Sequence, residues 1–420
     1  MRRSARAKQF RAANALFADA SDQSCVRDYI QYLALRGYAA KTISRYSASV
    51  AHFTHWLAGQ HLSVDDIDED SIERFLSEHV SDCRCAARRT HVPADCGTAL
   101  RHLSAILMAE GRCAPRQSLV PHLIVTELAD FDRYLANVRG LAVATRSGRL
   151  RHLRDFLLAQ FGTRSLQLDL LKPADVVDFM MSYTAGWAPA SIKQTNNSLR
   201  SYFGFRAIQG DEVRSLVACL PPIVEWRLAG LPQLLSPQEI DQLLGAFDQQ
   251  TATGKRDYAI TRCLLDLGLR RAEVARLQLE DIDWRSGTLR IRGKATRVDM
   301  LPLPGTTARA IAAYLQDGRP ATSRRELFVR HRPPVNGSAG PDIIRNAVRY
   351  AAKRCGLELR VRGTHILRHT LAGRLVQSGA RFKEIADLLR HRSLDTTTIY
   401  AKVDLPALSH VALQWPGEKA

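Results

Sequence analysis

The sequence lacks any long uninterrupted run of apolar residues, which argues against an integral membrane protein. A membrane-spanning helix needs about 20 apolar residues in succession, whereas charged side chains recur along all 420 residues. The Arg-rich start, residues 1–6, is not followed by an apolar segment, so a secretory signal peptide is not expected. An organellar transit peptide is the alternative for this start. We expect a cytoplasmic protein without a membrane partner.

Acidic residues are scarce relative to basic ones. The chain has 60 Lys and Arg against 42 Asp and Glu, a formal net charge of +18, and its sequence pI is about 9.9. This excess predicts an anionic partner, with nucleic acid as the first candidate and an anionic membrane surface as the second. Hydrophobic residues make up 45% of the chain, a share typical of globular proteins, so wholesale disorder is excluded.

Two kinds of motif that would indicate a metal-dependent or a nucleotide-driven enzyme are missing. No cluster of acidic residues with two-metal spacing accompanies the basic motifs described below. No glycine-rich phosphate loop ending in Lys and Ser or Thr occurs either. Metal-assisted hydrolysis and NTP-driven chemistry are therefore disfavoured, and we expect neither a cofactor nor a metal. Covalent catalysis by a hydroxyl group remains.

The cysteines show no disulfide framework. All 8 are scattered over a long chain without a secretory signal, which favours reduced thiols. The one cluster comprises Cys83, Cys85 and Cys96, with His91 between them. Zinc sites need four ligands, and a single residue between two cysteines is tighter than the usual spacing of roughly two to four. Free loop cysteines are the favoured interpretation, and a metal site is the alternative.

The first three-fifths of the chain predicts helices and a faint internal repeat. Residues 32–57 and 134–157 each contain Tyr-Leu, an Arg-Gly pair, a Thr, and then apolar residues at every third or fourth position. The Arg-Gly pair breaks one helix, and the Thr can cap the next. We therefore predict two helical bundles, residues 21–115 and 122–225, after a basic N-terminal segment, residues 1–20.

The rest of the chain predicts an α+β domain. Ser236 and Glu239 flank a proline in the pattern of a helix N-terminus. Residues 288–292 and 298–303 alternate between apolar and polar on either side of a short turn, which predicts an antiparallel hairpin. The predicted fold is mainly α with a small antiparallel β-sheet: tandem helical domains followed by an α+β domain, residues 233–404.

Basic and amide side chains lie among the apolar residues of both predicted bundles. Such groups donate hydrogen bonds to phosphates and to base edges, although a solvated helix surface has the same composition. The candidate DNA-binding residues are Arg45, Arg149, Lys193, Gln194, Asn196, Asn197 and Arg200.

Spaced motifs in the α+β region predict phosphate chemistry. The planar, permanently charged guanidinium groups of Arg270 and Arg368 can hold the two non-bridging oxygens of a phosphodiester. His365 lies three residues before Arg368, on the same face of a predicted helix, whose N-terminus favours an anion. The other residues of this set are Lys294, His391 and Tyr400.

This ordered set resembles the tyrosine recombinases, the phage-integrase family of site-specific DNA recombinases. Every catalytic position of the family finds a matching residue in order within residues 233–404. The resemblance implies that Tyr400 is the nucleophile, which forms a 3′-phosphotyrosyl bond and leaves a free 5′-hydroxyl. It implies that Arg270 and Arg368 clamp the phosphate. Because the phosphotyrosine conserves the energy of the broken bond, neither ATP nor metal is needed.

The same resemblance implies how protons move. Lys294 would be the general acid that protonates the departing 5′-oxygen, and His365 and His391 would assist proton transfer and bind the phosphate. A phenol has a pKa near about 10, so the nucleophile needs a base such as His365. We interpret Glu273 as support for the arginine clamp and His369 as structural.

The sequence departs from the family pattern at two places. The residue before His391 is normally glycine, which permits close approach of the backbone, and here it is Arg390. The hairpin turn that carries Lys294 is also shorter and less rich in glycine than usual.

The resemblance also implies partners. The bundle over residues 122–225 would be the core-binding, SAM-like domain, which grips duplex DNA together with the catalytic domain. The bundle over residues 21–115 would be an added copy that either contacts DNA or packs on a neighbouring protomer. The tail, residues 405–420, either seals its own domain or, as we prefer, docks on an adjacent protomer. A homo-tetramer on DNA is expected, with other recombinases or accessory proteins as further partners.

The leading hypothesis is a recombinase of a mobile element that cuts and rejoins duplex DNA at specific sites, in integration or transposition. A type IB-like topoisomerase shares the chemistry and is the first alternative. A non-enzymatic DNA-binding protein on a decayed recombinase scaffold is the second. In each case we expect a bacterial cytoplasmic protein that associates with the nucleoid when it binds DNA.

Overall fold

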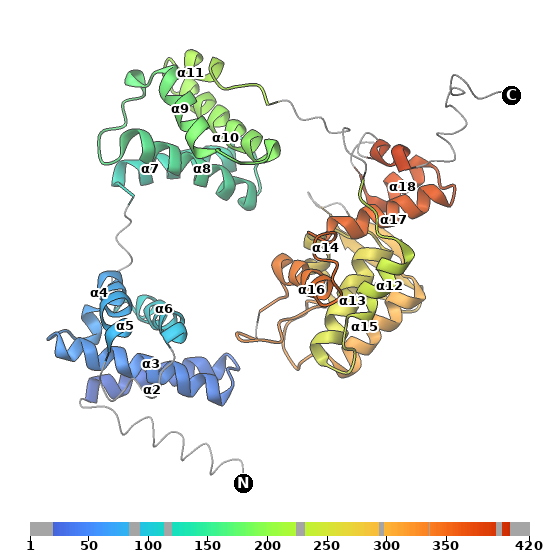
Figure 1. Ribbon diagram of the computed structural model, residues 1–420, viewed down its shortest axis with the longest axis horizontal. Helices are drawn as coiled ribbons and strands as arrows, with labels where there is room; N and C mark the ends of the chain where they lie inside the picture. The colour runs from blue at the N-terminus through green and yellow to red at the C-terminus, as the bar shows by residue number, and fades with distance from the viewer. Residues whose placement is uncertain are drawn as a thin grey trace, which may run out of the picture. The chain divides into compact units, whose positions relative to one another are not determined.

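A computed structural model of the chain describes residues 20–83, 93–112, 120–223, 232–293, 298–335, 337–391 and 397–403. The chain divides into two compact units: Ala114–Ala229 form one, and Met1–Cys113 with Gly230–Ala420 form the other. Helices dominate both units (Figure 1). None of the described helices combines the length and the apolar character that crossing a membrane requires.

The N-terminal residues form a helical bundle with its own hydrophobic core. Its elements are α2 (Ala20–Leu35), α3 (Ala40–Gly59), the 3₁₀ turn η1 (Val64–Asp66), α4 (Glu69–Arg74), the π-helical turn η2 (Phe75–His79), α5 (Val80–Asp82) and α6 (Pro93–Ala109). Helix α3 packs against both α2 and α6. The rings of Phe53 and Phe75 are fully buried in this core and meet edge to face at 5.0 Å.

The unit Ala114–Ala229 is a second helical bundle. Its elements are α7 (His122–Asn137), α8 (Val143–Phe161), the 3₁₀ turn η4 (Leu168–Leu170), α9 (Pro173–Tyr183), α10 (Pro189–Ile208) and α11 (Arg214–Ala218). Helix α8 packs on α7 and α10. Its fully buried Phe156 meets Phe203 of α10 edge to face at 6.0 Å.

The predicted repeat is present, with one correction. Gly37 and Gly140 of the two Arg-Gly pairs have φ angles of +76° and +58°, a conformation that suits glycine and ends a helix. The expected N-caps were wrong, because α3 and α8 begin after Ala39 and Ala142. The threonines therefore lie inside the first turn of each helix and not at its cap.

The C-terminal region joins helices to a small sheet. Its elements are α12 (Pro237–Gly245), α13 (Ala252–Asp266), α14 (Arg271–Arg276), the 3₁₀ turn η5 (Leu279–Asp281), β1 (Ile282–Asp283), β2 (Thr288–Arg292), β3 (Val298–Pro302), α15 (Gly305–Asp317), α16 (Pro341–Arg354), α17 (His365–Gln377), α18 (Phe382–Leu389) and the 3₁₀ helix η7 (Thr398–Val403). Helix α13 is central and packs against α14, α15, α16 and α17. The predicted N-terminal signal is confirmed, because Ser236 and Glu239 exchange hydrogen bonds of 2.8 and 3.1 Å at the start of α12.

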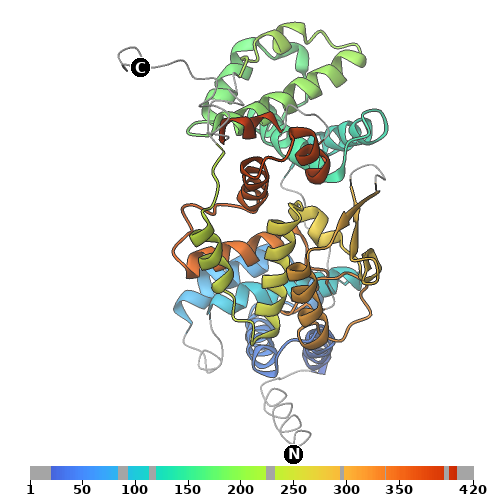
Figure 2. The same cartoon turned by 90° about the vertical axis from the view of Figure 1, so that its right-hand side faces the viewer.

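The predicted hairpin is confirmed and carries one further strand. The strands pair antiparallel in the order β1-β2-β3, with Leu289 opposite Leu301, and the hairpin stands out from the helices (Figure 2). Leu289 and Ile291 are fully buried, whereas the alternate residues Arg290 and Arg292 each contact the buried Asp281 carboxylate at 2.9 Å. The alternation therefore separates an apolar face from a charged one.

A smaller apolar cluster joins the last elements of the described chain. Leu371 and Val376 of α17, Ile385 and Leu389 of α18, and Tyr400 of η7 pack together in it. This packing places the last predicted catalytic residue beside the helix that carries two others.

Candidate active site

The site begins at the turn between α13 and α14. Gly268 has a φ of +57° there, and a Cβ on it would lie 2.5 Å from Leu389 Cδ2, so a larger residue would strain the backbone and displace Leu389. Arg270, the N-cap of α14, is held by Glu273: its backbone N–H donates to Oε2 at 2.7 Å and its Nη1 to Oε1 at 2.8 Å. Glu273 therefore orients the Arg270 side chain, as predicted.

Arg368 connects this turn with the end of α18. It lies on α17, is 4% exposed, and donates from its two terminal nitrogens to the carbonyl oxygens of Gly268 and Leu389. Burial, and then the positive charges of Arg270 and Arg390, lower the pKa of Arg368 to about 9. The guanidinium thus remains protonated at neutral pH. Because its neighbours are also positively charged, an anion bound beside it would be stabilised.

Arg390 shows why the departure from glycine is tolerated. It has a φ of +55°, in the left-handed region where glycine is ordinarily favoured. Its buried Nη2 donates to Glu273 Oε2 at 2.8 Å. Burial alone would raise the pKa of Glu273, but the charge of Arg390 and the bonds from Arg270 hold it below its ordinary value. The ion pair offsets the cost of the backbone conformation.

Tyr400 lies against α17. It is 1% exposed, and its Oη is 2.7 Å from Nδ1 of His369. Burial raises the pKa of Tyr400 to about 12, against the opposing charge of Arg368, so the phenol is protonated at neutral pH. His365 lies one turn before His369, with ring centroids 6.2 Å apart, and is exposed.

His391 follows the left-handed residue that ends α18. Its Nδ1 is 2.7 Å from Thr397 Oγ1, and its backbone N–H donates to the carbonyl of Ala386 at 2.9 Å. Burial, and then Arg368 and Arg270, lower the pKa of His391 to about 4. This imidazole is therefore neutral at physiological pH.

The structure brings most of the predicted catalytic residues into one region. Arg270, Arg368 and His391 come together through the turn after α13 and the end of α18. His365 lies on the same helix as Arg368, and Tyr400 of η7 packs against that helix. Lys294 lies outside the described residues. His369 contacts the phenol directly, although the sequence suggested only a packing role; its position one turn after His365 was the available signal.

Some of the predicted DNA-binding residues are hydrogen-bonded within the protein, and others are exposed to solvent. Asn196 is 5% exposed and donates to the carbonyl of Pro221 at 2.5 Å, so it does not face solvent as a base-reading amide would. Arg45 donates from Nε to Asp95 at 2.6 Å, and Arg149 donates to Ser201 Oγ at 2.8 Å. Lys193 is half-buried, and the exposed members are Gln194, Asn197 and Arg200.

Comparisons with known proteins bear on this site. The sequence model described as "Phage integrase family" matches residues 233–405, and that for "Phage integrase, N-terminal SAM-like domain" matches residues 26–111. A Sinorhizobium fredii protein named as integrase/recombinase y4rA is 35% identical over 392 residues, 93% of each chain. The chain belongs to the phage integrase family.

Other relatives agree with this membership. Tyrosine recombinase XerD of Listeria monocytogenes is 28% identical over 69% of this chain and 97% of its own. Among solved structures, a lambda integrase dimer bound to a COC′ core site aligns with a TM-score of 0.53 at 15% identity, over 70% of this chain and 98% of the other. XerH bound to palindromic difH aligns with a TM-score of 0.54 at 18% identity, over 69% and 84%. The predicted fold class and a tyrosine-type site-specific recombinase are confirmed.

The SAM-like match falls on the first helical bundle. It runs from α2 to just beyond α6, whereas the sequence analysis assigned the core-binding role to residues 122–225 and treated the first bundle as an added copy. The first bundle therefore carries the family's N-terminal domain signature.

We predict that Glu273 matters more to stability than Arg390. Glu273→Ala would leave the buried Arg390 without its carboxylate and remove a compensating negative charge from the surroundings of Arg368, at a cost of about 3–5 kcal/mol. Arg390→Gly keeps the pair between Glu273 and Arg270 and relieves the left-handed backbone, so it should cost about 1 kcal/mol or less. Hydrogen exchange of the amides of α14 and α18 would measure both effects. Equal destabilisation by the two substitutions would contradict this account.

We predict a pH dependence that originates at His391. The unfolded chain binds this proton at a pKa of about 6.5, whereas the folded protein binds it at about 4. As pH falls through this window the unfolded state gains the proton first, so the folded state loses stability. His391→Asn should lessen the fall in melting temperature between about pH 7 and pH 4.5. An unchanged fall would show that this imidazole is not held neutral.

Proposed function

We propose that this protein recombines specific DNA sites with Tyr400 as its nucleophile. The observation that carries the proposal is the contact of the buried Tyr400 phenol with His369, on the helix that also presents Arg368. A lone tyrosine near a C-terminus is ordinarily a packing residue. A phenol hydrogen-bonded to an imidazole and within the field of a buried guanidinium is equipped for transfer chemistry.

The phosphate would be bound between Arg270 and Arg368. Their guanidinium groups are permanently charged and planar, which suits two non-bridging oxygens. Negative charge grows on these oxygens as phosphorus becomes pentacoordinate, so the clamp stabilises the transition state more than the ground state. Glu273 positions Arg270 without facing the phosphate, because both its oxygens already accept from arginines.

The transfer step exchanges one phosphodiester for another. The Tyr400 oxygen bonds to phosphorus, and the bond from phosphorus to the 5′-oxygen breaks. The phenolic proton passes to Nδ1 of His369 or to His365, and Lys294 supplies a proton to the 5′-oxygen. Burial and the neighbouring His365 and Arg368 lower the pKa of His369, so this imidazole is neutral and able to accept a proton. Attack by the 5′-hydroxyl of another strand reverses the step.

Tyr400 cannot reach a phosphate from its described position alone. At 1% exposure its phenol is covered by side chains of α17 and α18, so cleavage requires η7 to move or the neighbouring helices to part. We propose that assembly on DNA supplies this change. The expected assembly is a homo-tetramer on duplex DNA, in which the tail of each protomer docks on the next. Transposition or integration of a mobile element in the bacterial cytoplasm is the proposed setting.

The exposed face of α10 is our proposed DNA contact in the second bundle. Gln194, Asn197 and Arg200 are exposed at intervals of three residues and so share one face of the helix. A hollow of about 400 Å³ opens at the N-terminal part of this face, lined by Arg151, His152, Trp187, Ala188, Ser191 and Gln194. Arginine, amide and indole groups suit contacts with phosphates and bases.

Tyr400→Phe should abolish covalent attachment to DNA while leaving binding intact, because the ring is kept and the attacking oxygen is lost. A nicked suicide substrate, which traps the covalent complex, gives the measurement on a denaturing gel. Tyr350→Phe, on α16 and 53% exposed, is the matched control and should form the adduct as the wild type does. An adduct formed by the Tyr400 variant would disprove the nucleophile assignment.

Arg200→Ala should weaken DNA binding and flatten its salt dependence. The slope of log affinity against log salt concentration is negative, and each lost phosphate contact reduces its magnitude by about 0.9. Gel-shift titrations over several salt concentrations would measure this slope. Arg133→Ala, on α7 and 74% exposed at its side chain, is the control and should leave the slope unchanged. Equal slopes for Arg200→Ala and the wild type would remove the α10 face from the proposed interface.

A further inference from the structure

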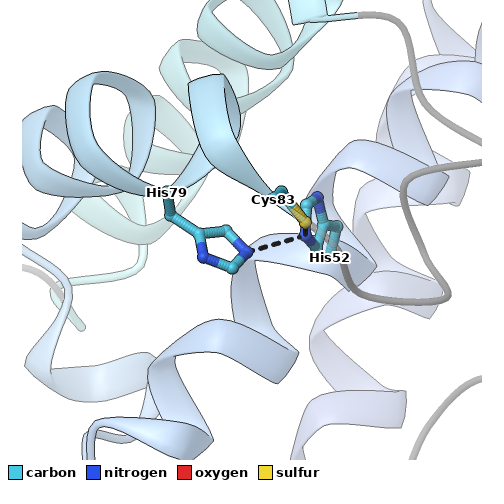
Figure 3. A group of neighbouring side chains, drawn as sticks. All are labelled: His52, His79 and Cys83. Carbon is cyan, nitrogen blue, oxygen red and sulfur yellow. Dashed lines mark hydrogen bonds between the residues drawn. The ribbon is translucent and has the colours of Figure 1, made fainter.

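Two histidines and a cysteine, none of them a predicted catalytic residue, converge inside the N-terminal bundle. His52 lies on α3, His79 ends η2, and Cys83 directly follows α5 (Figure 3). His52 Nε2 is 3.0 Å from His79 Nε2 and 3.3 Å from Cys83 Sγ. The three donor atoms all lie within 4.8 Å of one another. His52 and Cys83 are 1% and 2% exposed, and His79 is half-buried.

An unusual helical segment produces this convergence. Elements α4, η2 and α5 follow one another from Glu69 to Asp82, with a π-helical turn between two α-helical ones. π-Helical turns are rare in proteins, and those that do occur are often found at functional sites. His79 and Cys83 are four residues apart and therefore lie on the same side of the segment, where they face His52 across the bundle.

Aromatic packing holds the two imidazole rings in place. The ring of Phe75 meets His52 edge to face at 5.1 Å and stacks on His79 at 5.4 Å. Trp56 lies beside His79, with ring centroids 6.2 Å apart. Metal sites bind tightly when their ligands are fixed before the ion arrives, and these contacts fix both rings.

Hydrogen bonding alone suits this geometry poorly. A neutral imidazole nitrogen has either one proton or one lone pair, directed in the plane of the ring. His52 Nε2 nevertheless faces both His79 Nε2 and Cys83 Sγ. One proton or one lone pair can serve only one of these partners well. A cation between the three atoms accepts a lone pair from each.

We propose that His52, His79 and Cys83 bind a Zn²⁺ ion. With Zn–N bonds near 2.05 Å and Zn–S bonds near 2.3 Å, a tetrahedral site separates two nitrogens by about 3.3 Å and a nitrogen from a sulfur by about 3.5 Å. The observed separations of 3.0 and 3.3 Å come within a few tenths of an ångström of these values. Two imidazoles and a thiolate favour zinc over oxygen-seeking Mg²⁺ or Ca²⁺.

This site differs from the cysteine cluster considered in the sequence. Cys96 lies on α6 and is not a member of the group of donor atoms, and Cys85 and His91 lie outside the described residues. Only Cys83 is shared. Two histidines distant in sequence supply the other ligands, and a water would take the fourth position of the tetrahedron.

The ion would act as a structural clamp. It joins α3 to the end of the segment from α4 to α5 in the bundle that matches the SAM-like domain. Cys83 binds as a thiolate, so binding releases its proton, and both imidazoles bind through Nε2 in their neutral form. Because the unfolded chain lacks this arrangement, metal binding adds directly to the stability of the bundle.

Metal content of the full-length wild type is the first test. The protein is incubated with Zn²⁺, and excess metal is removed by gel filtration. Inductively coupled plasma mass spectrometry should then find about one zinc ion per chain. Co²⁺ in place of zinc should give the intense visible bands of a tetrahedral site and a sulfur-to-cobalt charge-transfer band in the near ultraviolet. Retention far below one ion per chain, or cobalt spectra without the sulfur band, would overturn the proposal without need of a variant.

Matched variants locate the ion. Cys83→Ser and His52→Ala should each weaken zinc affinity at least about tenfold, in a competition titration with a coloured chelator. The controls are His55→Ala, one turn along α3 and exposed, and Cys25→Ser, buried in the same core. Both controls should bind zinc as the wild type does. Full affinity in Cys83→Ser, or equal loss in Cys25→Ser, would contradict the assignment. These readouts do not depend on Tyr400 or on DNA cleavage.

Discussion

The candidate active site depends on a buried guanidinium that is held by backbone carbonyls. Arg368 is almost inaccessible and donates to Gly268 on one side and Leu389 on the other. These bonds join the turn that carries Arg270 to the helix end that carries His391. A buried cation is costly unless it is paired and hydrogen-bonded, and here the carbonyl dipoles offset only part of that cost. Arg270 and Arg390 add positive charge, and Glu273 is the carboxylate that both of these arginines contact directly. The pocket therefore carries excess positive charge that a phosphodiester would neutralise.

The same burial keeps the reactive groups in their neutral forms. Low solvent access raises the pKa of Tyr400 to about 12 and lowers that of His391 to about 4. The phenol thus keeps its proton, and the imidazole keeps an unprotonated nitrogen. As the proposed nucleophile, Tyr400 in this state would be unreactive toward solvent and toward stray electrophiles. Entry of a phosphate would bring the negative charge that the arginines favour, and transfer of the phenolic proton to a nearby neutral imidazole would then create the attacking oxygen. The same electrostatic environment therefore keeps the Tyr400 phenol protonated in the absence of DNA and favours its deprotonation once a phosphate is bound.

Many of the candidate site residues and the hairpin could be predicted from the sequence, because they depend on residue spacing and on local patterns of polarity. The arginines, His365, His391 and Tyr400 follow a spacing that a family resemblance can recognise, and the alternation of residues 288–292 predicts a strand without reference to anything else. The parts that escaped prediction depend on contacts between distant residues. The pair between Arg390 and Glu273 spans 117 positions, and it helps to hold a left-handed residue other than glycine. The bond of His369 to Tyr400 spans 31. Periodicity reports which face of a helix is buried, but not which side chain of another helix it meets.

The two helical bundles share a similar order of helices but differ in the polar side chains that surround a buried histidine. In the second bundle the buried His152 is 3.2 Å from the Tyr183 hydroxyl and 3.5 Å from the Thr195 hydroxyl, and Tyr183 donates to Asp155 at 2.8 Å. Hydroxyl groups both donate and accept, and Thr195 donates to the carbonyl of Ser191 at 3.4 Å. Nδ1 of His152 therefore needs to serve Tyr183 alone, and protons satisfy this network. In the first bundle the buried His52 instead faces an imidazole and a thiol, groups whose shared property is a lone pair suited to soft and borderline cations. The tandem repeat thus preserves helices and turns, while the buried polar groups decide that one bundle needs only hydrogen bonds and the other has the donor set of a metal site.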